Sequence, residues 1–323
     1  MSAGRMLIVS PVRNEAEHIE RTARSVAAQT RRPDLWLVVD DGSEDETPAI
    51  LRRLERELPF LRVLSTPPSY TTDHGDRHAV AAAPRAFNWA LATEDPSTFT
   101  HVGKLDGDIE LPSNYFERLL AEFERDHSLG LAGGTLVGRA EGGWRPERVA
   151  EHHVRGALKL YTQPCFEAIG GVQERLGWDG IDETYARMHG FQTRSFGDLI
   201  ARHHRPCGSA DGWLKGRVRG GETHYVLGFH LLWVVLKSFK VAASRPLLIS
   251  GAAFLYGYIR AAARGTPRVD DADYRRFLRE DLRWRLVGTV RAPLYRVRRR
   301  LGSTADGGRP ARAKSSDFGR SFM

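Results

Sequence analysis

Strand and helix signals alternate along roughly the first 140 residues of this 323-residue chain. Short apolar runs that suit buried strands occupy residues 6–10, 35–39, 60–64, 98–105 and 129–137. The segments between them carry apolar residues at helical spacing, such as Ile50, Leu51, Leu54 and Leu58. This order predicts an α/β fold with a mostly parallel sheet that is covered by helices on both faces. Ligands of such sheets bind at the carboxyl ends of the strands.

Two acidic motifs lie at such strand ends. Asp40-Asp41-Gly42-Ser43 follows the second predicted strand, and Lys104-Leu105-Asp106-Gly107-Asp108 ends the fourth. Mg²⁺ and Mn²⁺ prefer oxygen ligands, often taking one or two carboxylates and leaving the other positions to water and substrate phosphates. The alternative for each motif is a turn, with Ser43 as the N-cap of the next helix, and at Asp40–Ser43 capping and ligand binding are compatible. The carboxylates of Asp106 and Asp108 therefore indicate a divalent cation that carries a diphosphate.

Three segments in chain order resemble the motifs of family 2 glycosyltransferases. They are Ser10-Pro11-Val12-Arg13-Asn14-Glu15, Val38-Val39-Asp40-Asp41-Gly42-Ser43 and Leu105-Asp106-Gly107-Asp108. The resemblance covers roughly residues 5–225 and rests on the ordered set, because a single Asp-x-Asp is a weak signal. It implies the GT-A fold, a nucleotide-diphospho-sugar transferase sandwich, and a sugar transfer that usually inverts the anomeric centre.

The resemblance also implies a donor site. The loop after the first strand, through Pro11, Arg13 and Glu15, is expected to contact the nucleoside of the donor. Asp41 is expected to accept a hydrogen bond from the imide nitrogen of uracil or thymine, because an ionised carboxylate only accepts. These roles favour a UDP- or dTDP-sugar as the donor.

By the same resemblance, the cation is Mn²⁺ or Mg²⁺. Asp106 leans towards the ribose and the metal-bound water, and Asp108 coordinates the cation. Related enzymes complete the metal shell with a histidine after the acceptor helix. In Arg202-His203-His204-Arg205 we assign that role to His204, although His203 is equally placed by sequence and a pair of surface histidines is the alternative.

A catalytic base is expected at the start of a helix, about eleven residues before a Gly-aromatic step. Counting back from Gly190-Phe191 gives Asp179, where the family's usual Glu-Asp dipeptide is replaced by Trp178-Asp179. Asp182 is the rival base, and Asp182 or Glu183 otherwise caps the helix or binds the acceptor. A structure in which these carboxylates only cap the helix remains an alternative. The segment that includes Trp213, Arg217, Arg219 and Gly220-Gly221 is predicted to be a mobile loop whose arginines clamp the diphosphate.

The formal net charge of +8 is concentrated in the last part of the chain. Residues 291–323 carry nine Lys or Arg against two Asp, so the remaining residues have a net charge near +1. This distribution argues against specific nucleic-acid binding and predicts a basic, disordered tail with weak affinity for anionic surfaces. We expect three regions, namely a GT-A catalytic domain over 1–222, a helical extension over 223–290 and the tail over 291–323.

The apolar runs Tyr225–Leu236 and Pro246–Ile259 are flanked by basic residues. They are too short to span a bilayer, and they suit helices that lie in a membrane interface or, equally, pack on the core or form dimer contacts. Cys165 and Cys207 make no disulfide framework, and the N-terminal residues lack the apolar core of a signal peptide. We therefore expect a cytoplasmic protein that attaches to the cytoplasmic face of the membrane if the interfacial alternative holds.

The acceptor is expected to be a saccharide or a lipid-linked sugar, used in the synthesis of cell-surface polysaccharide or glycolipid.

Two other classes of protein share the features of this sequence. A nucleotidyltransferase uses the same fold and cation, but its first loop is usually rich in Gly and Arg, and Pro11–Glu15 contains no glycine. A non-catalytic nucleotide-sugar-binding protein would need no base.

Overall fold

One mixed β-sheet forms the centre of the molecule in the computed structural model, which describes residues 4–67, 70, 81–140, 143–147, 150–205, 212–242 and 248–283. The nine strands of this sheet run in the order β3-β2-β1-β4-β8-β6-β9-β5, and β7 pairs with β6. Their bounds are β1 (Met6–Val12), β2 (Leu35–Asp40), β3 (Leu61–Ser65), β4 (His101–Leu105), β5 (Ile109–Glu110), β6 (Leu129–Ala140), β7 (Gly143–Pro146), β8 (Leu158–Thr162) and β9 (Gln192–His203).

The strands predicted from apolar runs are all present as β1, β2, β3, β4 and β6, and the first four form a parallel half of the sheet. β1 pairs in parallel with β2 and β4, β2 pairs in parallel with β3, and β6 pairs in parallel with β9. β8 lies antiparallel between β4 and β6. The pairing of β6 with β9 shifts register between Gly134 and Thr135, where β9 contains extra residues around Gly197–Leu199. The predicted α/β fold is confirmed.

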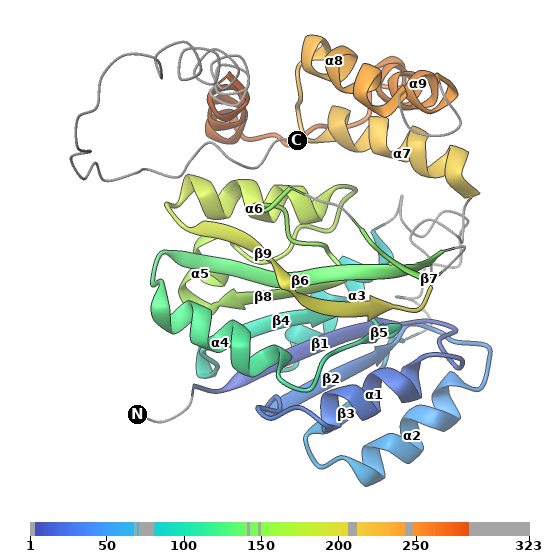
Figure 1. The fold of residues 1–323 in the computed structure, drawn as a ribbon, viewed down its shortest axis with the longest axis vertical. Helices are drawn as coiled ribbons and strands as arrows, with labels where there is room; N and C mark the ends of the chain where they lie inside the picture. Colours follow the sequence, from blue (N-terminus) through green and yellow to red (C-terminus); the bar gives the residue numbers. More distant parts are fainter. Residues whose placement is uncertain are drawn as a thin grey trace, which may run out of the picture.

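Helices cover both faces of the sheet, as Figure 1 shows. Their bounds are α1 (Ile19–Ala27), α2 (Thr47–Glu57), α3 (Ala82–Leu91), α4 (Tyr115–Arg125), α5 (Gln163–Ala168) and α6 (Trp178–Met188), with a 3₁₀ turn at Pro96–Thr98. Alternate residues of β1 point to opposite faces: Met6 and Ile8 pack with α1, α2 and α4, whereas Leu7 and Val9 pack with α3, α5 and α6. Both faces of the strand are therefore buried, which explains its continuous apolar run.

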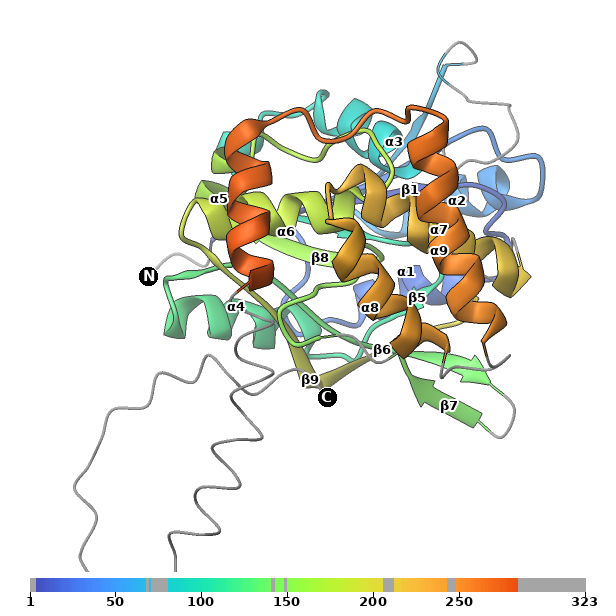
Figure 2. The same cartoon turned by 90° about the horizontal axis from the view of Figure 1, so that it is seen from above.

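A second layer of helices lies over α6 (Figures 1 and 2). It contains α7 (Gly212–Val226), α8 (Leu231–Ala242), α9 (Ile249–Ala263) and a helical segment at 272–283. Ile181 of α6 packs with Leu227, Tyr274 and their neighbours in an apolar cluster that joins this layer to the sheet domain. Among the described residues, no helix has both the length and the apolar character needed to cross a bilayer.

The start of this layer corrects one sequence prediction. Trp213, Arg217 and Arg219 belong to the helix α7, so the predicted mobile loop is wrong, and α7 also runs across the boundary that we placed at residue 222. Gly220 and Gly221, which suggested a loop, serve helix packing instead. The predicted tail over 291–323 lies outside the described residues.

Glycines bring α7 and α9 into backbone contact. A β-carbon on Gly221 would overlap the carbonyl oxygen of Phe254, and one on Gly257 would overlap that of Val218. No rearrangement of a flexible side chain relieves these overlaps, because both involve the backbone of the neighbouring helix. The crossing of α7 and α9 therefore requires glycine at both positions.

We predict that Gly257→Ala lowers the free energy of unfolding by about 1–3 kcal/mol, the usual cost of overpacking. Gly216→Ala in α7 is the matched control, because its β-carbon would meet nothing within 4 Å. The control should raise stability by about 0.5–1 kcal/mol, since Ala favours the helix over Gly. Thermal or urea denaturation measures both, and equal effects of the two substitutions would contradict the close crossing.

Candidate active site

Two loops at the carboxyl ends of β1 and β2 are tied together by hydrogen bonds. The Asn14 N–H donates to Ser43 Oγ at 2.9 Å, and the Glu44 N–H donates to Asn14 Oδ1 at 2.8 Å. Asn14 adopts a left-handed backbone with φ of 53°, which Asn tolerates better than most residues. The Ser43 hydroxyl is thus used between loops. The prediction that it caps the next helix is wrong, because α2 begins four residues later, at Thr47.

The predicted donor-binding residues lie together on these loops. Pro11 pairs with Val39 near the end of β1, and Arg13 forms an ion pair with Glu44 at 3.2 Å. Asp41 is buried, and its Oδ1 accepts a hydrogen bond from Thr66 Oγ1 at 3.0 Å. The two loops therefore form one edge of a candidate site.

The Asp-Gly-Asp motif joins β4 to β5 beside this edge. A β-carbon on Gly107 would lie 2.7 Å from Val12 Cγ1, so glycine allows the motif to pack against the end of β1. The Thr22 hydroxyl of α1 donates to the Gly107 carbonyl at 2.8 Å and fixes the turn. Asp106 and Asp108 are thereby held next to the loop that carries Glu15.

The three carboxylates form an acidic cluster. Burial, and then the negative charges of Asp108 and Asp106, raise the pKa of Glu15 to about 8, although Arg205 at 2.8 Å opposes the shift. After burial, the neighbouring carboxylates of Asp108 and Asp106 thus contribute to the shift in the pKa of Glu15. A cluster of this kind suits a cation.

Asp108 is buried against His203, which β5–β9 pairing places beside it. Asp108 Oδ2 lies 3.3 Å from His203 Nε2, and His203 Nδ1 lies 3.0 Å from Glu147 Oε1. The other oxygen of Glu147 is held by Arg155. Burial disfavours the charged forms of Asp108 and His203, but the hydrogen bond and the opposite charges between them favour those forms more strongly. The pKa of Asp108 is lowered, and the pKa of His203 is raised to about 10 with Glu147 contributing.

His204, which we expected near the cation, points elsewhere. Its Nε2 lies 2.7 Å from Glu110 Oε2, and its Nδ1 lies 3.3 Å from Arg21 Nη1. His203 is the last residue of β9 and pairs with Ile109 of β5, next to Asp108, whereas His204 follows the end of the strand. The structure selects His203 over His204 for that position.

The donor set at the motif fits Mg²⁺ or Mn²⁺. Asp106 and Asp108 offer oxygen atoms, and His203 holds the Asp108 carboxylate in place from behind. In the part of the chain that the structure describes, no group of three or more His, Cys, Asp or Glu has the geometry of a complete metal site. Two carboxylates with room for water and phosphate are the arrangement expected for a cation that arrives with a diphosphate.

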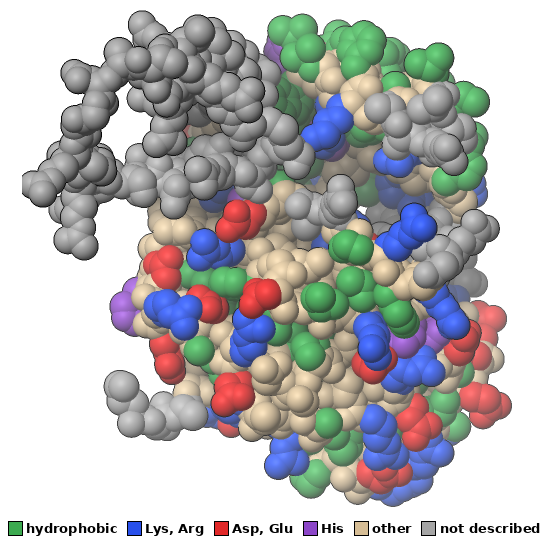
Figure 3. Space-filling view, viewed as in Figure 1, with side chains coloured by type: hydrophobic (Ala, Val, Ile, Leu, Met, Phe, Trp, Pro, Cys, Tyr) green, Lys and Arg blue, Asp and Glu red, His purple; other side chains and the backbone are tan. Residues whose placement is uncertain are grey.

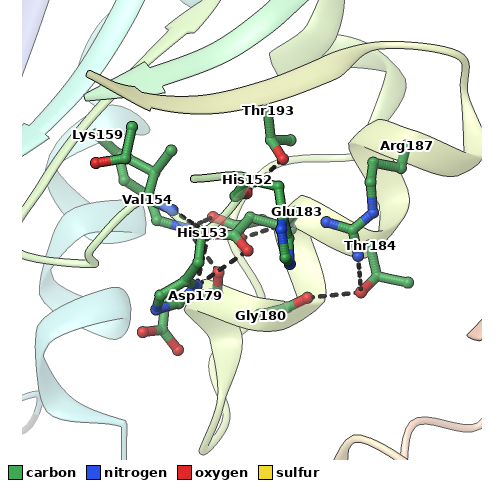
Figure 4. A network of polar contacts seen from close by, with 12 residues as sticks. His152, His153, Val154, Lys159, Asp179, Gly180, Glu183, Thr184, Arg187 and Thr193 are labelled. Atoms are coloured by element: carbon green, nitrogen blue, oxygen red, sulfur yellow. Dashed lines mark hydrogen bonds and ion pairs between the residues drawn. The ribbon is translucent and has the colours of Figure 1, made fainter. Parts of the chain in front are cut away.

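The candidate base lies at the start of α6, which follows Gly177 in a left-handed conformation with φ of 80°. Asp179 is in the first helical turn and half-buried. Its carboxylate lies outside the hydrogen-bonded network drawn in Figure 4 and forms no hydrogen bond with the described residues. It is thus available to a ligand.

Asp182 and Glu183 have a different environment. They are 2% and 3% exposed, and both face Lys159, whose Nζ lies 2.8 Å from Asp182 Oδ1 and 3.5 Å from Glu183 Oε1. Tyr161 donates its hydroxyl to Asp182, and the Val154 N–H donates to Glu183 at 2.7 Å. The capping prediction is wrong for both residues, because α6 begins four residues before Asp182. Their carboxylates are therefore used inside the protein, in contrast to that of Asp179.

Two buried lysines and Trp178 connect the acidic cluster to α6. Lys104 and Lys159 are direct partners on β4 and β8, and each ammonium lies over the Trp178 ring, at 5.4 and 5.3 Å from its centroid. Lys104 forms an ion pair with Asp106, and Lys159 donates to the Asp179 carbonyl at 2.7 Å. Asp106 and Asp179 therefore face one region. Lys159 was missed in the sequence, where its only signal is a charge inside the apolar run 158–161.

This geometry agrees with a comparison of the sequence with protein families. A model described as Glycosyl transferase family 2 matches residues 7–170, just over half of the chain. The chain belongs to glycosyl transferase family 2. The protein is therefore a glycosyltransferase, as the motifs predicted. No curated protein matches this glycosyltransferase in sequence.

Solved structures show the same fold. The mannosyltransferase PcManGT from Pyrobaculum calidifontis, solved with GDP-Man and Mn²⁺, is 21% identical at a TM-score of 0.50, over 88% of this glycosyltransferase and 81% of its own chain. TarS from S. aureus, solved with UDP-GlcNAc, is 16% identical at a TM-score of 0.50, over 82% and 74%. These similarities confirm the GT-A fold.

The contact between His153 and Glu183 predicts a pH-dependent stability. The negative charge of Glu183, whose Oε2 lies 3.1 Å from His153 Nδ1, raises the pKa of His153 above its ordinary value of 6.5. This contribution is fully present below pH 6.5 and is lost as the pH rises through the folded-state pKa. His153→Gln should cost about 1.5–3 kcal/mol at pH 6 and less at pH 9, measured by urea denaturation.

His189→Gln is the matched control, because His189 is exposed at the end of α6, the helix that carries Glu183. The cost of this substitution should not depend on pH in this way. A constant cost of His153→Gln from pH 6 to pH 9 would show that the imidazole is not charged in the folded protein.

Proposed function

We propose that this glycosyltransferase is metal-assisted and inverting, with a UDP- or dTDP-sugar as its donor. The observation that carries the proposal is that two unlike carboxylate groups lie next to Trp178. Asp106 and Asp108 form an acidic cluster with Glu15, and Asp106 is paired with Lys104, whose ammonium lies 5.4 Å from the centroid of the Trp178 ring. The residue after Trp178, Asp179, carries a carboxylate with no hydrogen-bond partner among the described residues. The pair Asp106 and Asp108 would bind a cation, and Asp179 would accept a proton.

The donor would lie along the edge formed by the loops after β1 and β2. Pro11, Arg13 and Glu15 would contact the nucleoside, and buried Asp41 would accept from its imide nitrogen. The two structures of similar fold were solved with different nucleotides, GDP-Man and UDP-GlcNAc, so the preference for UDP or dTDP rests on Asp41.

Asp106 and Asp108, with His203 behind Asp108, would hold Mn²⁺ or Mg²⁺. When bound, the cation supplies positive charge beside the leaving nucleoside diphosphate, where negative charge develops in the transition state. The structure of PcManGT with GDP-Man and Mn²⁺ supports this use of the fold. His203 replaces His204 in this proposal, because His203 is the imidazole that faces Asp108.

Asp179 would remove the proton from an acceptor hydroxyl. That oxygen would attack the anomeric carbon from the face opposite the diphosphate, which inverts the centre without a covalent enzyme intermediate. Asp182 is assigned a structural role, since its carboxylate is neutralised by Lys159. A saccharide or lipid-linked acceptor, used in surface polysaccharide or glycolipid synthesis at the cytoplasmic face of the membrane, fits this chemistry.

Donor binding should stabilise the protein only with the cation. We predict that a UDP- or dTDP-sugar with Mn²⁺ raises the melting temperature, because a ligand at one hundred times its Kd adds about 2.7 kcal/mol. EDTA or Asp108→Asn should remove most of this shift. A thermal-shift panel of nucleotide sugars with and without Mn²⁺ measures it, and equal shifts without the metal would contradict the metal assignment.

Asp179→Asn should separate binding from transfer. We predict that it keeps the donor-dependent thermal shift and loses sugar transfer by about 10²–10⁴-fold, the usual contribution of a general base. Asp182→Asn is the matched control and should instead lower the melting temperature, because it leaves the Lys159 ammonium without its carboxylate. Release of nucleoside diphosphate in the presence of acceptor is the assay. Normal transfer by Asp179→Asn would exclude it as the base.

A further inference from the structure

Large apolar side chains gather on the outer surface of the helical layer. Of the twelve exposed large hydrophobic residues in the described part of the chain, ten lie between residues 213 and 259, so the patch is confined to this layer. Figure 3 shows hydrophobic side chains gathered at the top right, over α8 and α9. We call the following set the apolar face: Leu232, Leu236, Phe239, Ile249, Tyr256 and Ile259, which are 48–71% exposed.

The helix α9 is apolar on its exposed side as well as on its buried side. Its exposed positions at 249, 252, 256, 259, 262 and 263 are Ile, Ala, Tyr, Ile, Ala and Ala. Its buried side contains Gly251, Ala253 and Gly257 together with Phe254 and Tyr258. In α4, by contrast, the exposed positions include Glu117, Glu124 and Arg125. A helix that is apolar on both sides favours an apolar environment on its outer side too.

The charges around the apolar face have one sign. The described residues from 212 to 264 contain seven Lys or Arg and a single acidic residue, Glu222. Glu222 is already paired with Arg260. Exposed Lys240 and Arg264 lie at the ends of α8 and α9, next to the apolar residues. A surface that is apolar at its centre and positive at its edges is complementary to anionic lipid headgroups over acyl chains.

We propose that the apolar face docks in the plane of a bilayer that contains anionic lipids. α8 has 12 residues and α9 has 15, too few for the roughly 20 residues that cross the hydrocarbon core, so these helices would lie along the surface. A second copy of the chain is a less suitable occupant. A symmetric contact would oppose two positive edges and leave the basic residues without anionic partners. The proposal does not depend on the donor, the metal or Asp179.

Vesicle co-sedimentation with the full chain tests this proposal, using phosphatidylcholine vesicles with and without phosphatidylglycerol. Phe239→Asp should lower the partition coefficient for the anionic vesicles about tenfold, because a 71% exposed ring no longer enters the interface. Ile200→Asp is the matched control, since Ile200 is 49% exposed on β9, away from the helical layer, and should leave binding unchanged. All variants carry the same basic tail, so its contribution cancels.

Lys240→Glu with Arg264→Glu should weaken binding to anionic vesicles and reduce its salt dependence. Melting temperatures identify any variant that fails to fold, and Phe239→Ser then replaces Phe239→Asp. Absence of binding to anionic vesicles would overturn the proposal, and so would equal binding by Phe239→Asp and the wild type. Sedimentation that shows a dimer in the wild type and a monomer in Phe239→Asp would assign the face to a second copy instead.

Discussion

Lys104 and Lys159 face each other across β4 and β8, each only 3% exposed. Like charges at directly opposite positions of a sheet are unfavourable, and buried ammonium groups need partners. Lys104 finds Asp106 and Lys159 finds Asp182, while the Trp178 ring lies against both cations. The start of α6 and the Asp-Gly-Asp turn are thus positioned by the same two charges. The sheet domain brings its acidic cluster and its candidate base together through this one arrangement.

The parts of the site that the sequence predicted are those encoded locally. The strands β1 to β4 and the acidic turns that follow β2 and β4 were visible because apolar runs and their carboxyl ends are contiguous in the chain. The choice between His203 and His204 could not be predicted from the sequence. It depends on the register between β5 and β9, in which Ile109 pairs with His203. The buried ion pair of Asp182, which we had considered as a rival base or a helix cap, was missed for a similar reason. The partner residue Lys159 lies 23 residues earlier on a strand, and nothing near Asp182 in sequence marks it as buried.

The helix α6 has two functions in the architecture. Near its start it carries Asp179, and through Ile181 it packs against Leu227 and Tyr274 of the helical layer. Gly221, one of the two glycines of the α7–α9 crossing, was predicted to lie in a loop, because sequence alone does not distinguish a flexible glycine from one that permits backbone contact. With the layer fixed on α6, a docked apolar face would set the orientation of the catalytic domain relative to the bilayer. A lipid-linked acceptor would then be presented to α6 from one side.

The shift of register in β9 has a consequence for how this chain tolerates change. Residues 200–203 are in phase with β6 only because the bulge around Gly197–Leu199 contains a fixed number of residues. Gly197 itself leaves open space, since a β-carbon there would meet nothing within 4 Å. Amino-acid replacements at Gly197 should therefore be tolerated. The loss of one residue from the bulge would instead present His204 to Asp108 in place of His203, and the gain of one residue would present Arg202. The number of residues in the bulge, and not their identity, therefore determines which side chain lies beside Asp108.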